Sequence, residues 1–178
     1  MLIDRAQSVL VLIDIQERLM PAIADSAEII ENARRLAEAA TLLEVPVKAT
    51  EQYPRGLGAT VPELKPFLPE VVSKTSFCAV PEQESTWSLL PPERGEIVIA
   101  GAEAHVCVLQ TVLELRNRNV RTVVVADAVG SRAQSSRDRA LDRMRDHGVE
   151  IVTTEMVLFE WLRDSTHPVF RDVQRLIR

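Results

Sequence analysis

Residues 97–111 read IVIAGAEAHVCVLQT. The apolar run from Ile97 to Ala100 is followed by small residues and then by a second apolar stretch, which predicts a buried strand, a tight turn and a helix that begins near Cys107. The first turn of a helix carries amides without partners and the positive end of the helix dipole. Both lower the pKa of a thiol and can hold a negatively charged oxygen. This stretch therefore predicts an α/β fold with a candidate nucleophile at the end of a strand.

Short apolar runs and helical patterns continue to alternate along the chain. We interpret as strands the runs 8–13, 45–50, 71–72, 96–100, 121–126 and 149–153, and as helices the segments 25–43, 107–119, 133–147, 155–163 and 168–177. We expect Asp25 to cap the first of these helices together with Glu28, three residues later. Such alternation is typical of βαβ units around a mainly parallel sheet. The length of 178 residues fits one domain, residues 1–178.

Composition narrows the class of protein. The net charge is −5 at pH 7, and the arginines are interleaved with acids, so we expect no nucleic-acid partner. No apolar run approaches the roughly 18 residues needed to cross a bilayer, and the first residues do not form a signal peptide, so we expect a cytoplasmic protein without a membrane partner. The only cysteines, Cys78 and Cys107, should be free thiols. Metal-ligand spacings are lacking, and we expect no metal and no cofactor.

Candidate functional residues follow the predicted strands. Ligands of parallel α/β sheets bind beyond the carboxyl ends of the strands, where Asp14, Lys74 and Cys107 stand. Asp14 could accept the thiol proton and Lys74 could stabilise the thiolate, which is a coherent set for nucleophilic attack on a carbonyl compound. A second interpretation stays open, because any α/β protein carries charged residues there. In that case the carboxylate caps a loop, the amine is solvated and the thiol is a small core side chain.

Three motifs stand in a defined order along the chain: VLIDIQ at 11–16, SKTSF at 73–77 and GAEAHVCV at 101–108. With these motifs the chain resembles the isochorismatase-like cysteine hydrolases. The stretches TEQYP at 50–54 and MVLFE at 156–160 are similar to the branch of isochorismatase domain-containing proteins. The resemblance implies a Rossmann-like, three-layer α/β/α fold with a six-stranded, mainly parallel sheet.

The resemblance also implies a mechanism. An Asp-Lys-Cys triad is carried onto Asp14, Lys74 and Cys107, and the thiolate attacks a small amide or a related carbonyl compound to form a thioester. The backbone amides of Glu103 and Cys107 are expected to form the oxyanion hole, with a cis peptide bond between Ala102 and Glu103. The substrate of such an enzyme is a small molecule.

The chain departs from related enzymes at two places. Nicotinamidases of this fold hold a metal with an Asp-x-His pair and a second His, whereas Glu51-Gln52-Tyr53 follows the second predicted strand here. A metal-dependent nicotinamidase is therefore disfavoured.

Many family members carry Thr three residues before the cysteine, but here Ala104 stands at that position. Isochorismatases, which cleave a vinyl ether, need not use a thiol, so the presence of Cys107 favours amide chemistry.

Several residues near the triad have expected positions. We expect Gln16, Gln52 and Phe77 to lie next to the triad and to line the substrate pocket. A purely structural role for each of them stays open. An inward carboxylate would oppose an oxyanion, so we expect the side chain of Glu103 to point away and to pair with an arginine. We expect the helix to turn His105 away from the thiol.

Two functions of other classes also fit the sequence. The fold could serve as a non-catalytic binding or scaffold protein with an incidental thiol, or as a redox-responsive protein in which Cys78 pairs with Cys107 after oxidation. The apolar stretch 156–162 predicts a homo-oligomer. Trp87 and Trp161 are expected in the core or in a subunit contact.

Overall fold

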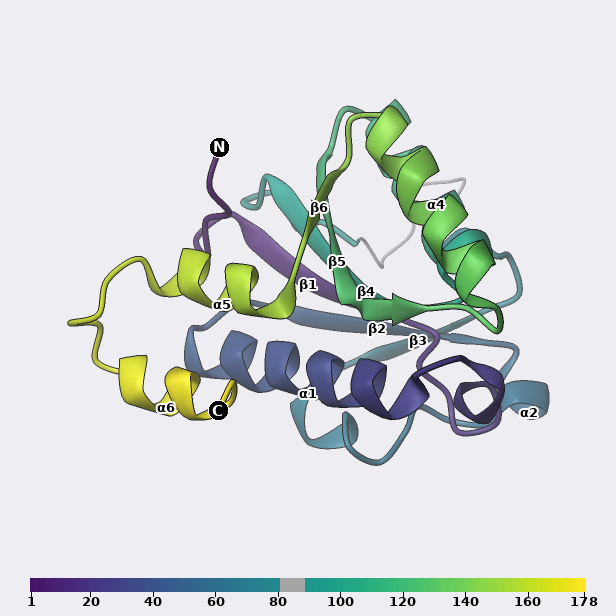
Figure 1. Cartoon of the computed structure of the whole chain (residues 1–178), viewed down its shortest axis with the longest axis horizontal. Coiled ribbons are helices and arrows are strands. Elements are labelled where there is room, and N and C mark those ends of the chain that lie inside the picture. The colour runs from purple at the N-terminus through teal and green to yellow at the C-terminus, as the bar shows by residue number, and fades with distance from the viewer. Residues whose placement is uncertain (81–88) are drawn as a thin grey trace.

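The computed structural model describes residues 1–80 and 89–178. A six-stranded sheet lies between two layers of helices (Figure 1). Its strands follow the order β3-β2-β1-β4-β5-β6, and every neighbouring pair is parallel. The strands are β1 (Ser8–Ile13), β2 (Val47–Gln52), β3 (Val71–Lys74), β4 (Glu96–Ala102), β5 (Arg121–Gly130) and β6 (Glu150–Val152). The predicted three-layer α/β/α fold with a six-stranded, mainly parallel sheet is confirmed.

The helices form two layers because the central strands are apolar on both sides. Alternate residues of a strand point to opposite faces, so Leu10 and Leu12 of β1 join one hydrophobic cluster, while Val9 and Val11 join the other. The first cluster includes residues of α1 (Ser26–Leu42), α5 (Thr154–Leu162) and α6 (Phe170–Arg175), and the second includes residues of α3 (Leu109–Asn117) and α4 (Gln134–Asp146). No helix of the described residues is long and apolar enough to cross a membrane.

Four short helical segments complete the described chain. They are the 3₁₀ segments η1 (Met20–Ala22) and η2 (Lys65–Phe67), the short α2 (Pro54–Leu57) and the π-helical η3 (Ala104–Val108). The helix predicted to begin near Cys107 thus begins earlier, at Ala104, and its first turn is π-helical. Cys107 lies inside this wide turn and not at the first position of an α-helix.

The start of α1 differs from the prediction. Asp25 is the N-cap residue, but it has a φ of 55° and makes no side-chain capping bond. Its carboxylate instead accepts a hydrogen bond from Gln134 at the start of α4. The predicted capping box with Glu28 is therefore wrong, because the left-handed backbone of Asp25 is not the extended conformation that such a cap requires.

The structure describes one of the two tryptophans and the apolar stretch 156–162. Trp161 is entirely buried, and its indole N–H donates to the hydroxyl of Ser8 at 2.9 Å. Trp87 lies outside the described residues. Within the stretch 156–162 the chain itself buries four side chains, and only Met156 and Phe159 remain exposed among its large apolar residues, at 45% and 41%. The homo-oligomer stays a prediction.

Two neighbouring strands approach each other tightly at Gly101. This residue of β4 pairs with Ile13 at the end of β1 and has a φ of 147°. A Cβ atom at this position would lie 2.3 Å from the carbonyl oxygen of Ile13. Only glycine therefore lets the carboxyl ends of these two strands, which lead to Asp14 and to η3, approach this closely.

Replacing Gly101 by alanine is expected to lower the free energy of unfolding by at least about 2 kcal/mol, because the new methyl group meets backbone and the φ is unfavourable for an L-residue. Urea unfolding followed by circular dichroism measures the change. Gly95→Ala is the control, since its Cβ atom would meet only the end of the Gln7 side chain, at 3.0 Å. Equal stability of the two variants would contradict this account of Gly101.

Candidate active site

Asp14 directly follows β1 and is entirely buried. Its backbone has a φ of 53°, in the left-handed region that aspartate tolerates better than most residues. The hydroxyl of Thr50 donates to Oδ1 at 2.7 Å, and Nζ of Lys74 donates to Oδ2 at 2.7 Å. A buried carboxylate is stable only when it is paired and hydrogen-bonded. Both carboxylate oxygens meet this requirement.

Lys74, the last residue of β3, holds the compensating positive charge. Its side chain is 9% exposed. Besides Asp14, its ammonium group donates to Oε1 of Gln52 at 2.7 Å and to the carbonyl oxygens of Ser76 and Phe77 at 3.2 Å. An ammonium group has three hydrogens, so these acceptors saturate it. Lys74 is therefore a positioned charge within the sheet edge and not a solvated amine.

Cys107 brings the thiol to the same place from η3, and it is 6% exposed. Burial, together with the negative charge of Asp14 and the hydrogen bond between that carboxylate and the thiol, raises the pKa of Cys107 to about 12, although Lys74 opposes this change. The expected net lowering of the thiol pKa is therefore wrong. Desolvation by burial is the largest influence, and a nearby anion disfavours the thiolate. Both effects favour the protonated thiol over the thiolate.

The peptide bond between Ala102 and Glu103 is cis, as the resemblance implied. A backbone hydrogen bond from Glu103 to the Cys107 sulfur lowers the thiol pKa slightly against the burial. The carboxylate of Glu103 accepts from Nε of Arg132 at 2.7 Å and from the Arg132 amide at 3.2 Å. The expected ion pair with an arginine is confirmed. The oxyanion-binding role of the amides of Glu103 and Cys107 stays a prediction.

The three expected pocket residues have different positions. Gln16 is entirely buried, and its side-chain amide bonds the backbone of Gln52 and Gly58. Through these bonds Gln16 ties the end of β2 to the following loop, and its pocket-lining role stays a prediction. Gln52 donates to the Thr75 carbonyl and accepts from the lysine ammonium, so it positions that charge. Phe77 is 52% exposed, and its contact with substrate stays a prediction.

His105 and Cys78 flank the site without reaching its centre. Nδ1 of His105 hydrogen-bonds the hydroxyl of Ser131 at 2.9 Å and lies 3.6 Å from the Glu103 carboxylate. The histidine thus faces β5 and α4, as expected for a side chain turned away from the thiol. Cys78 is a half-buried free thiol whose pKa is raised, mainly by burial. Its redox role stays a prediction.

Thr50 is a residue of the candidate site that the sequence pattern did not reveal. Its hydroxyl is the neutral hydrogen-bond donor to Asp14, and it is 1% exposed. The position could have been found from the sheet, because Thr50 pairs with Ile13, the residue before Asp14. Within the described residues no three His, Cys, Asp or Glu side chains converge to hold a metal ion. Independence from metals stays a prediction.

Comparison with known proteins identifies the family. The model of the Isochorismatase domain matches residues 8–156. The chain belongs to the isochorismatase domain family. Isochorismatase domain-containing protein 2 of Danio rerio, a member of similar length, is 41% identical over 96% of this chain and 86% of its own length.

Solved structures of isochorismatase-like proteins share the fold. The structure titled MAR1 Ribonuclease from Caenorhabditis elegans has a TM-score of 0.90 and 38% identity, and it covers 99% of this chain and 92% of its own. YcaC from Escherichia coli, described as an octameric hydrolase of unknown specificity, has a TM-score of 0.80 at 23% identity, covering 99% and 94%. The second likeness shows the fold alone.

The raised pKa of Cys107 yields a prediction with a definite sign. Because the Asp14 carboxylate raises the pKa of Cys107, Asp14→Asn is expected to lower that pKa and to shift the pH profile of alkylation by iodoacetamide to lower pH. Alkylation depends on the thiolate, so the variant reacts faster than the unmodified protein at pH 8. Lys74 keeps three other oxygen acceptors in this variant.

Mass spectrometry of the alkylated Cys107 peptide measures the rate at each pH. Asp25→Asn is the matched control, because it removes an equal charge from an exposed position and should leave the profile unchanged. Slower alkylation in Asp14→Asn than in the unmodified protein would show that the carboxylate promotes thiolate formation in the free site, contrary to this prediction.

Proposed function

We propose that this protein is a metal-independent cysteine hydrolase that acts on a small amide or related carbonyl compound through a Cys107 thioester. One observation carries the proposal: a wholly buried carboxylate, Asp14, is held on both oxygens by Lys74 and Thr50 and hydrogen-bonds the thiol of Cys107. A core cysteine without chemistry would not require a buried ion pair beside it. Membership of the isochorismatase domain family supports a hydrolytic reaction.

The first half of the proposed reaction forms the thioester. Asp14 takes the thiol proton while the sulfur attacks the carbonyl carbon, and the carbonyl electron pair moves to oxygen. The amides of Glu103 and Cys107 donate to this oxyanion. The bond from carbon to the leaving nitrogen then breaks as Asp14 returns the proton to that nitrogen. Ammonia or an amine departs, and the acyl group remains on sulfur.

The second half releases the acid. Asp14 accepts a proton from a water molecule while the oxygen of that water attacks the thioester carbon. The carbon–sulfur bond then breaks, and the departing thiolate takes the proton from Asp14. The fixed ammonium of Lys74 compensates the negative charge that moves between carboxylate and sulfur in both halves. A thiol that is protonated at rest fits this scheme, because the carboxylate is then present as the base.

The Caenorhabditis elegans structure is named as a ribonuclease, which suggests RNA as an alternative substrate for this chain. Two features favour a small carbonyl compound instead. The net charge is −5, which opposes an electrostatic attraction for the phosphate backbone. The candidate triad is almost entirely buried, whereas an RNA strand needs an open, basic surface. A labelled RNA in the activity assay tests this alternative directly.

Substitution of the thiol tests the covalent mechanism. The purified protein is incubated with a panel of small amides, and the release of ammonia or amine is quantified with and without a chelator. Cys107→Ser is expected to lower turnover by roughly a thousandfold or more, and the chelator is expected to have no effect. Cys78→Ser is the matched control and should retain turnover within about twofold.

An activated ester provides a test that does not depend on the natural substrate. Mixing with p-nitrophenyl acetate should add one acetyl group to Cys107, observed by intact mass and peptide mapping, and this adduct should be lost in Cys107→Ser but kept in Cys78→Ser. Turnover by Cys107→Ser at the rate of the unmodified protein would refute the thioester mechanism, as would acylation elsewhere.

Thr50 is expected to be a positioning residue for Asp14. Thr50→Val keeps the shape but removes the 2.7 Å hydrogen bond to the carboxylate, and a bond to a charged group contributes about 1.5–3 kcal/mol. We therefore expect kcat/KM to fall by roughly tenfold to a hundredfold, with Thr50→Ser restoring most of it. Failure of serine to restore more activity than valine would assign Thr50 a packing role only.

A further inference from the structure

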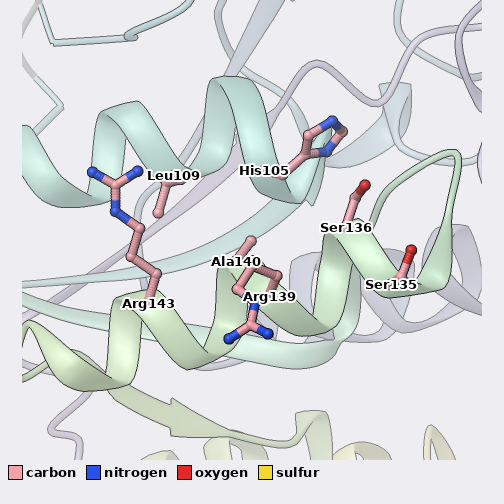
Figure 2. A pocket seen from close by; sticks show the side chains of 7 residues that line it. All are labelled: His105, Leu109, Ser135, Ser136, Arg139, Ala140 and Arg143. Carbon is pink, nitrogen blue, oxygen red and sulfur yellow. The ribbon is translucent and has the colours of Figure 1, made fainter.

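We propose that the cavity between η3 and α4 is a second binding site, specific for the phosphate group of a small molecule. The cavity has a volume of about 410 Å³ and is lined by His105, Leu109, Ser135, Ser136, Arg139, Ala140 and Arg143. Figure 2 shows Arg139 and Arg143 coming from α4, with His105 and Leu109 on the facing helical segment. None of these seven residues is acidic.

The two arginines of this cavity stand out among the charged residues of α4. The acids Asp138 and Asp142 pair with Arg137 at 3.2 Å and with Arg145 at 2.9 Å. Arg139 and Arg143 lie four residues apart, on one face of the helix. Within residues 1–80 and 89–178, neither has a carboxylate within salt-bridge distance. In a chain of net charge −5, two arginines that line one cavity without a carboxylate partner favour an anionic ligand.

The other end of the cavity adds hydrogen-bond donors. Ser135 and Ser136 belong to the first turn of α4, whose N-cap residue Ala133 offers no side-chain acceptor to that turn. Both serines line the same cavity as the two arginines, and they lie at the positive end of the helix dipole. Nδ1 of His105 is occupied by Ser131, which leaves Nε2 as the ring nitrogen for a ligand.

This set of groups selects the chemistry of the ligand. Guanidinium groups bind phosphate through paired N–H donors, and hydroxyl groups complete the contacts to its oxygens. Leu109 and Ala140 form an apolar part of the lining, where a carbon skeleton attached to the phosphate can pack. Inorganic phosphate and phosphorylated small molecules share the chemistry that the cavity recognises.

The site is distinct from the thioester chemistry but is connected to it. His105 lies two residues from Cys107, and its ring is 3.6 Å from the carboxylate of Glu103. The proposal concerns binding alone and can be tested without knowledge of the substrate.

Calorimetric titration of the full chain with inorganic phosphate, at constant ionic strength against chloride, tests the site. We expect saturable binding with a Kd on the order of 1 mM and at least about tenfold weaker binding by the double variant Arg139→Gln/Arg143→Gln. Phenyl phosphate should compete with inorganic phosphate and bind more tightly because of its ring. Both arginines are exposed, so the variant should fold, which circular dichroism checks.

The matched control is Arg145→Gln/Arg175→Gln, which removes the same charge from two exposed arginines that pair with their own acids. It should keep the affinity of the unmodified protein. No saturable binding, or an equal loss in both double variants, would overturn the proposal.

Two further measurements test whether the cavity binds a second copy of the chain or an RNA and not a small phosphorylated molecule. If Arg139→Gln/Arg143→Gln changes the oligomeric state in light scattering, the cavity is an interface between copies of the chain. If a short single-stranded RNA displaces phosphate and binds far more tightly than phosphate does, the cavity binds a nucleic-acid backbone. Either result would overturn the small-molecule proposal, whereas an unchanged oligomer without RNA competition supports it.

Discussion

The buried carboxylate of Asp14 is the constraint on which the candidate site depends. A charge with no exposure to water must be compensated by the protein itself. The charge and the groups that compensate it come from three strands. β1 supplies the acid, β2 supplies the hydroxyl of Thr50 and the amide of Gln52, and β3 supplies the ammonium of Lys74. The parallel order of these strands brings their carboxyl ends to one edge of the sheet. The parallel order of the strands thus determines which charged and polar groups meet in the site.

The same burial determines the state of the thiol. A helix start alone favours a thiolate, but here desolvation and the adjacent carboxylate outweigh both the lysine charge and the backbone hydrogen bond. In the proposed reaction, acid, amine and thiol form one set in which a proton moves between carboxylate and sulfur. On that proposal the cysteine becomes reactive only when a substrate binds, because no permanently ionised thiolate is needed.

Close backbone packing brings the thiol of Cys107 to the buried ion pair. Gly101 allows the end of β4 to lie against Ile13, so that the turn into η3 carries Cys107 towards Asp14. At the start of η3, the ion pair of Glu103 with Arg132 and the contact of His105 with Ser131 connect the segment to the residues between β5 and α4. Contacts on two sides therefore hold the segment that carries the thiol.

The α/β class, the six strands and the positions of Asp14, Lys74 and Cys107 at or after strand ends could be predicted from the sequence alone, because buried strands and strand ends have local patterns of apolar and polar residues. The family motifs added the cis peptide bond, which no local pattern predicts. Long-range contacts determine that Thr50 supports Asp14, that Gln16 is buried, that Asp25 does not cap its helix and that the thiol pKa is raised. These properties depend on neighbours distant in the chain and on the exclusion of water, and neither is present in a local stretch of sequence.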